Sequence, residues 1–136
     1  MAKKKKSLRV SRGEMDLLLM LWSEGALTLQ QAHQAFARYT KPIAYPTMQT
    51  RLNRMVTKGL LSRSKTRPSV YDAAVTRESV TAGHLNELTE KLGGGQVVPL
   101  VAQLISDRRL SEKEMDELTD LLRDARNNQN KQRRKR

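Results

Sequence analysis

The stretch over residues 45–59 most constrains what this chain can fold into, because its pattern predicts a helix with two different faces. At the spacing of an α-helix its apolar residues fall on one stripe, and they are Met48, Leu52, Met55 and Val56. The opposite side carries hydrogen-bond donors and no acidic residue. Pro46 suits the first helical position, and Gly59 suits a left-handed C-terminal cap.

The polar face has the side chains that base edges and phosphates require. Arginine can bridge the two acceptors of guanine, glutamine or asparagine can pair with adenine, and the methyl group of threonine can contact thymine. The alternative is an ordinary solvated face of an amphipathic helix. The candidate DNA-contacting residues are Thr47, Gln49, Thr50, Arg51, Asn53, Arg54 and Lys58.

Two further helices are predicted before this one. Ser11 and Glu14 form a capping-box pattern ahead of a densely apolar segment that ends at Trp22, and Thr28 and Gln31 form a second such pattern. The second helix runs toward Tyr39. Helices joined by a short turn, with donors on the last one, predict a helix-turn-helix whose recognition helix enters the major groove.

A β-hairpin is predicted directly after the recognition helix. Residues 60–65 and 70–74 have strand-like patterns, and residues 66–69 have the composition of a turn. The hairpin completes a winged helix-turn-helix over residues 8–75, in a chain that is otherwise mainly α-helical. Its basic side chains are expected to contact backbone phosphates, although charge also protects exposed sheet edges. They are Arg63, Lys65 and Arg67.

Residues 76–127 are predicted to form an α-helical dimerisation domain. A helix over residues 76–92 ends at three glycines, a short apolar helix follows, and Ser111 with Glu114 caps a third. So small a unit cannot cover its own apolar residues, which favours pairing with a second copy over packing against residues 8–75. The residues expected at the dimer contact are Leu85, Leu88, Leu92, Val97, Leu100, Val101, Leu104, Ile105, Leu118, Leu121 and Leu122.

Charge is divided unevenly along the chain, whose net charge is +12. Residues 7–75 carry ten basic and four acidic residues, and residues 76–130 carry seven and ten. The division suggests that one half faces a polyanion and the other faces protein. Residues 1–7 and 128–136 are predicted to be disordered basic tails that add sequence-independent phosphate contacts.

Several other kinds of site are excluded by the composition. The chain has no cysteine, which removes disulfides and zinc knuckles and fits a reducing cytoplasm. Its apolar runs are too short to span a bilayer, so we expect a soluble protein without membrane insertion. His33 and His84 lack further ligands for a metal. No phosphate-binding loop or nucleophile motif is present, so neither an enzyme nor a cofactor is expected.

Four segments of the chain carry a family resemblance: SRGEMDLLLMLW at residues 11–22, AYPTMQTRLNRMVTKGLL at 44–61, RPSVY at 67–71, and LGGG with PLVAQLISDRRLSEKEMDEL within 92–118. In this order and spacing, they make the chain resemble the penicillinase repressors of the BlaI/MecI type over nearly its whole ordered length. The resemblance implies a bacterial, homodimeric transcriptional repressor of β-lactam-responsive or related genes. It implies a winged helix, a helical dimerisation domain and an operator with dyad symmetry.

The resemblance also assigns individual residues. Thr47 and Thr50 match operator-reading threonines, and Arg54 matches a phosphate-contacting arginine. Gln49 stands where the family has arginine and Arg51 where it has leucine, which predicts a different operator sequence.

In the family, a membrane sensor-protease triggered by a β-lactam leads to cleavage of an Asn–Phe bond. The matching residues here are Gln103 and Leu104, so the apolar context agrees and the bond does not. A related copper-sensing branch uses a cysteine cluster, which this chain lacks. Two other functions remain open at this stage: a sequence-independent, architectural nucleic-acid-binding protein, and a protein-interaction module.

Overall fold

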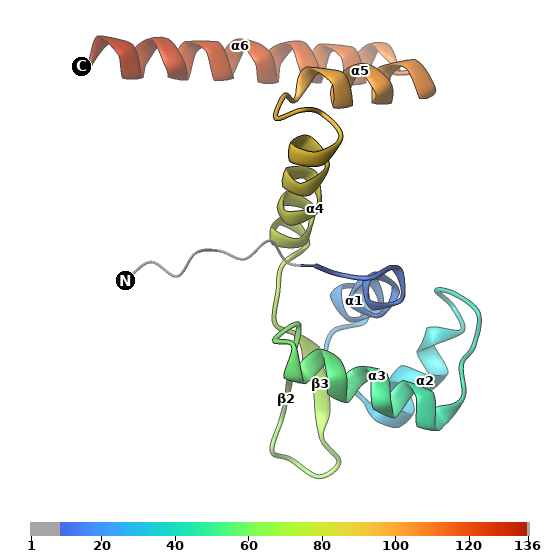
Figure 1. Ribbon diagram of the computed structural model, residues 1–136. Coiled ribbons are helices and arrows are strands. Elements are labelled where there is room, and N and C mark those ends of the chain that lie inside the picture. The colour runs from blue at the N-terminus through green and yellow to red at the C-terminus, as the bar shows by residue number, and fades with distance from the viewer. Residues whose placement is uncertain (1–8, 136) are drawn as a thin grey trace. The chain divides into compact units, whose positions relative to one another are not determined.

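The computed structural model describes residues 9–135 and divides them into two compact units, with the boundary between Leu88 and Thr89 (Figure 1). The first unit contains α1 (Arg12–Glu24), β1 (Leu27–Thr28), α2 (Leu29–Phe36), α3 (Tyr45–Thr57), β2 (Leu61–Arg63), β3 (Val70–Ala73) and most of α4 (Arg77–Lys91). The second contains α5 (Val98–Asp107) and α6 (Glu112–Arg134). The predicted fold class, mainly α with a small β-hairpin, is confirmed.

Side-chain caps fix where the helices begin. The hydroxyls of Ser11, Thr28 and Ser111 each accept a hydrogen bond from the backbone N–H three residues later, and the side chain found there bonds back to the cap. Each box satisfies two N–H groups that the first turn leaves without partners. Thr76 caps α4 in a similar way, accepting from Ser79 N at 3.0 Å. All four predicted starts are confirmed.

The end of α3 is set by Gly59. Its φ angle of 83° lies in the left-handed region that glycine adopts without strain. Around it, Gly59 N donates to Val56 O and Leu60 N donates to Met55 O, which satisfies carbonyls of the last helical turn. The prediction for Gly59 is confirmed, whereas Pro46 is the second helical residue rather than the first.

The sheet has three antiparallel strands in the order β1-β3-β2. The predicted hairpin is present, with Leu61 opposite Ala73 and Arg63 opposite Tyr71. The strand β1 was not predicted. It pairs Leu27 with Tyr71 and Thr28 with Val70, so the wing is hydrogen-bonded to the segment between α1 and α2.

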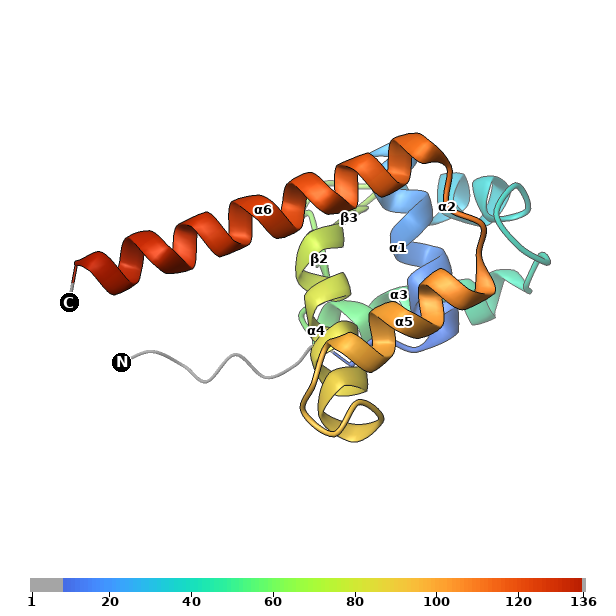
Figure 2. The same ribbon diagram turned by 90° about the horizontal axis from the view of Figure 1, so that it is seen from above.

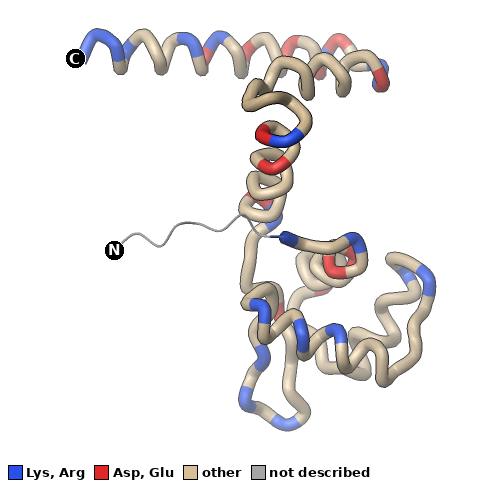
Figure 3. The backbone as a smooth tube through the Cα atoms, in the orientation of Figure 1, with Lys and Arg blue, Asp and Glu red and all other residues tan. Residues whose placement is uncertain are grey.

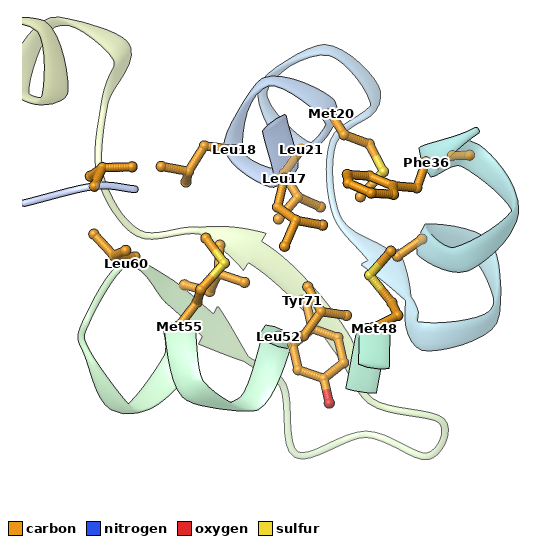
Figure 4. Packing of buried hydrophobic residues seen from close by; sticks show 14 of the residues in the cluster. Leu17, Leu18, Met20, Leu21, Phe36, Met48, Leu52, Met55, Leu60 and Tyr71 are labelled. Atoms are coloured by element: carbon orange, nitrogen blue, oxygen red, sulfur yellow. The ribbon is translucent and has the colours of Figure 1, made fainter. Parts of the chain in front are cut away.

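The core of the first unit lies between α1, α2, α3 and the sheet (Figure 4). From α3, Met48 and Leu52 are fully buried and Met55 nearly so, while Val56 packs at the edge of the cluster. This confirms the apolar stripe of the recognition helix. The other large, fully buried side chains are Leu17, Leu18, Met20, Leu21, Phe36 and Leu60.

The first unit extends past residue 75, the end of the winged helix-turn-helix predicted from the sequence. Val80 of α4 is only 5% exposed and belongs to the core. Trp22 Nε1 donates to Val75 O at 3.0 Å, and the Arg77 guanidinium lies 5.2 Å from the Trp22 ring centroid. The start of α4 is therefore anchored to α1, and the boundary lies thirteen residues later than predicted.

The second unit is helical to nearly the end of the described chain. Figure 2 shows α6 as one unbroken helix. The prediction of a disordered tail over residues 128–136 is wrong for residues 128–134, because glutamine, lysine and arginine extend an existing helix readily and its last turn gains from positive charge. The predicted tail over residues 1–7 lies outside the described residues. None of the described helices is both long and apolar enough to cross a membrane.

Candidate nucleic-acid interface

The donor face of α3 is open to solvent. Thr47, Gln49, Thr50, Arg51 and Arg54 are all exposed, while the stripe on the other side of the same helix is buried. Figure 3 shows basic residues along α3 and along the β2–β3 wing. The fold therefore brings together the predicted helix residues and the predicted wing residues within the first unit.

Thr50 is held by its own helix. Its Oγ1 donates to Pro46 O at 3.0 Å, which uses the single hydrogen of the hydroxyl. What Thr50 can still offer a base is the acceptor capacity of the oxygen and its methyl group. Thr57 makes the same bond to Asn53 O at 3.2 Å, two turns further along α3.

Arg51 and Arg54 lie against the start of α1. They line an open pocket together with Met55 of α3 and with Ser11, Gly13 and Glu14. A Cβ atom on Gly13 would stand 3.3 Å from Arg51 Nη1, so the absence of a side chain there lets the guanidinium approach α1. Among the described residues neither arginine has a carboxylate partner, which leaves both charges available to phosphate.

Lys58 is bound within the protein. Its Nζ lies 2.8 Å from both carboxylate oxygens of Glu14, whose Oε1 also accepts from Ser11 N at 2.9 Å. Burial raises the pKa of Glu14. The hydrogen bonds from Lys58 and Ser11 and the charge of Lys58 together outweigh this effect, so the pKa of Glu14 lies below its ordinary value. Glu14, the acidic residue of the α1 capping box, therefore offsets the charge of the lysine expected to contact DNA.

Asn53 is also engaged inside the protein. It is half-buried, and its Oδ1 accepts hydrogen bonds from Arg63 Nη1 at 3.2 Å and from the Tyr71 hydroxyl at 3.0 Å. Tyr71 had not been singled out by sequence reasoning. An aromatic residue in a short strand after the turn was the one signal for it, because such residues face the core.

The turn of the wing is built by its own hydroxyls. Ser64 Oγ accepts from Val70 N at 2.9 Å and lies 2.6 Å from Thr66 Oγ1, and Ser69 Oγ donates to Thr66 O at 3.2 Å. These bonds order the loop while its charged side chains stay exposed. Those side chains are Arg63, Lys65 and Arg67, all at the predicted wing positions.

In the second unit the residues predicted for the dimer contact are mostly exposed. Leu92, Val97, Val101, Leu104, Ile105, Leu121 and Leu122 are exposed large hydrophobic residues, and Leu100 and Leu118 are half-buried. Leu104, which was assigned both to the dimer contact and to the matched cleavage position, is 56% exposed, because the two helices α5 and α6 alone cannot enclose it. A pocket between α5 and α6 is lined by apolar residues and by three charged ones, namely Val101, Leu104, Ile105, Leu110, Leu118 and Leu121 with Arg108, Glu114 and Glu117.

Leu85 and Leu88, the other two residues assigned to the dimer contact, lie on α4 and are about half exposed. Gln103, the first residue of the matched cleavage position, is exposed within α5. Its Nε2 donates to Asp107 at 3.0 Å.

The two histidines occupy separate places. His33 Nε2 lies 2.8 Å from Ile43 O, and its ring packs edge-on to Tyr45 with centroids 5.3 Å apart. His84 Nε2 is buried without a hydrogen-bond partner in the described structure. No group of three metal-binding side chains occurs among the residues that the structure describes.

Comparison with known proteins places the chain in a family. Residues 10–124 match the penicillinase repressor family. A penicillinase repressor of Staphylococcus aureus is 23% identical over 120 residues, which cover 88% of this chain and 94% of that protein.

Two solved structures are also similar. The first is the solution structure of the monomeric form of Bacillus licheniformis BlaI in complex with the blaP half-operator, at 21% identity and a TM-score of 0.47, covering 54% of this chain and 90% of that chain. The second is a MarR family protein from Bacillus stearothermophilus, at 17% identity and a TM-score of 0.47, covering 90% and 77%. Because the family match covers most of the chain, the chain belongs to the penicillinase repressor family and is a DNA-binding transcriptional repressor.

Proposed function

We propose that the protein is a homodimer that represses transcription by binding a DNA operator with dyad symmetry. One observation carries the proposal: a helix fixed by a buried stripe presents exposed Thr, Gln and Arg side chains beside an ordered, basic wing. The order of elements is that of a winged helix-turn-helix, in which the second helix of the motif enters the major groove.

Each exposed residue of α3 receives a role from its chemistry and position. Thr47 and Thr50, near the start of α3, are assigned to base edges, because recognition helices read bases with their N-terminal residues. Arg54 is assigned to a phosphate. Gln49 and Arg51 differ from the family pattern, and we propose that they set an operator sequence of this chain's own.

The wing is assigned to the DNA backbone. Arg63, Lys65 and Arg67 are exposed around a hydroxyl-braced turn. Contacts to phosphates position a protein on DNA without reading sequence, and they account for half or more of the hydrogen bonds in such interfaces. Lys58 is given a lesser part, because Glu14 already neutralises its charge.

Dimerisation is assigned to the second unit and the end of α4. The second unit exposes several large leucines, valines and an isoleucine, and exposed apolar surface that is contiguous marks protein–protein contacts. A symmetric pair of second units would cover these side chains and set two α3 helices on two half-sites of one operator.

Release by a membrane sensor-protease stays a prediction that rests on the family resemblance. Gln103 and Leu104 lie in the middle of α5, with Gln103 bonded to Asp107. Proteases cleave extended backbone, so α5 would have to unwind before this bond was cut. Induction without cleavage of this bond is the alternative.

The test is selection of bound sequences from a random duplex pool with the full chain. We expect a palindrome. Arg54→Ala should weaken binding to all sequences alike, and Thr50→Ala should relax preference at one base pair per half-site, by roughly 1 to 3 kcal/mol. Thr57→Ala is the matched control, since Thr57 makes the same helix bond at the far end of α3. Enrichment of no sequence would support the architectural function instead.

A further inference from the structure

One oxygen atom joins the recognition helix to both strands of the wing. Asn53 Oδ1 accepts from Arg63 Nη1 on β2 at 3.2 Å and from the Tyr71 hydroxyl on β3 at 3.0 Å. Arg63 and Tyr71 are directly opposite each other in the sheet register. A single side chain of α3 therefore holds a cross-strand pair, at the last residue of β2.

These contacts occupy the group that base reading would need. Asparagine recognises adenine with its amide nitrogen as donor and its Oδ1 as acceptor. Arginine can only donate, so the atom facing Arg63 must be the oxygen, and the two bonds use both of its lone pairs. Asn53 Oδ1 would have to give up at least one of these two internal bonds before it could accept a hydrogen bond from a base.

The position of Tyr71 supports the same conclusion. It is 5% exposed, and Figure 4 shows its ring among the buried residues beside Leu52, with the hydroxyl oxygen at its outer end. Tyr71 cannot contact DNA from there without leaving the core. Its hydroxyl is thus a donor dedicated to Asn53.

We propose that Asn53 is a positioning residue for the wing and not a reader of bases. It orients the Arg63 guanidinium, which spends one of its five donors on Asn53 and keeps the others for phosphate. The wing arginine then meets the DNA in a geometry fixed relative to α3. This inference rests on the proposed function, because it assumes that α3 and the wing bind one duplex.

The experiment compares full-length Asn53→Ala, Tyr71→Phe, Arg63→Ala and the double variant Asn53→Ala with Arg63→Ala, with Thr57→Ala as control. Sequence preference is measured by selection from a random duplex pool, backbone contacts by hydroxyl-radical footprinting, and affinity at several salt concentrations.

We expect Asn53→Ala to keep the wild-type base preference and to lose the wing footprint. Its affinity should also depend less on salt. Between about 50 and about 200 mM salt, the variant should lose about threefold less affinity per wing than the wild type, as expected for one lost phosphate contact. Arg63→Ala should give the same result, and the double variant should be no worse than either single one, because both changes remove one contact. Tyr71→Phe should weaken the wing footprint without any change in base preference.

A relaxed preference at one base pair in Asn53→Ala, with the wing footprint intact, would overturn the proposal. So would losses that add in the double variant. If the wild-type chain selects no sequence, the proposed function fails by itself. The positioning role is then tested by measuring the free energy of unfolding of Asn53→Ala, Tyr71→Phe and the double variant. A double variant that loses less than the sum of the two single losses supports the role, and losses that add refute it.

Discussion

Replacing Leu122 by alanine tests the proposed dimer contact quantitatively. Leu122 is 72% exposed in the single chain, and complete burial of a leucine is worth about 1.5 to 3 kcal/mol. Covering the exposed part should contribute about 1 to 2 kcal/mol, and alanine retains one of the four side-chain carbons, so each copy should lose about 1 kcal/mol. A twofold dimer contains the change twice, which gives about 2 kcal/mol, or about a 30-fold higher Kd for dimerisation.

Sedimentation over a range of protein concentrations measures that Kd directly. Lys113→Ala is the matched control. It changes an exposed residue of the same helix, and nine residues at about 100° each place it on the opposite side from Leu122. The control should leave the Kd unchanged, and both variants should keep the helical content of the wild-type chain.

An unchanged Kd for Leu122→Ala would refute the reasoning, because it would mean that this side chain stays in water in the dimer. A wild-type chain that remains monomeric at micromolar concentration would go further and remove the dimer contact altogether. An equal rise in Kd for the two variants would show that weaker dimerisation comes from a less stable α6 helix and not from the loss of an apolar contact.

Three other outcomes follow from the first unit. Leu52→Ala removes a fully buried side chain and should lower the free energy of unfolding by about 3 kcal/mol, measured by urea denaturation and independent of protein concentration. Gly59→Ala meets no atom within 4 Å, so only the left-handed backbone opposes it, and thermal unfolding should reveal a cost of about 1 kcal/mol. Glu14 has a lowered pKa, so its pairing with Lys58 stabilises the fold above about pH 4.3, the ordinary glutamate value, and that stability is lost as the pH falls through the lower folded value. Glu14→Gln should remove about 0.5 to 1 kcal/mol at neutral pH and flatten the acid limb of the stability profile.

The parts of the fold that follow local rules were predictable from the sequence. The capping boxes at Ser11, Thr28 and Ser111, the glycine after α3 and the apolar stripe of that helix all depend on residues within a few positions of one another. The exposed donors of α3 were predictable for the same reason, since the burial of one helix face determines which residues lie on the other.

No pattern in the sequence indicated the contacts whose partners are distant in the chain. Glu14 and Lys58 are 44 residues apart, and Asn53 is 18 residues from Tyr71, so neither pairing leaves a local pattern. Lys58 and Asn53, two residues predicted to contact DNA, therefore each have a partner within the chain. At the C-terminal end of α6 the error was different, because a polar, basic composition suggested disorder although its residues have high helix propensity.

The pairing of β1 with β3 has a consequence for how the domain folds. Leu27 and Tyr71 lie 44 residues apart, and the chain between them contains α2, α3 and β2. Closing so long a loop costs entropy before the two-residue strand returns any hydrogen bonds. Helices α1 and α2 can form early from local contacts, but the central strand arrives only once residue 73 has been synthesised. We therefore expect the sheet to form late, and its completion to limit the folding rate of the DNA-binding unit.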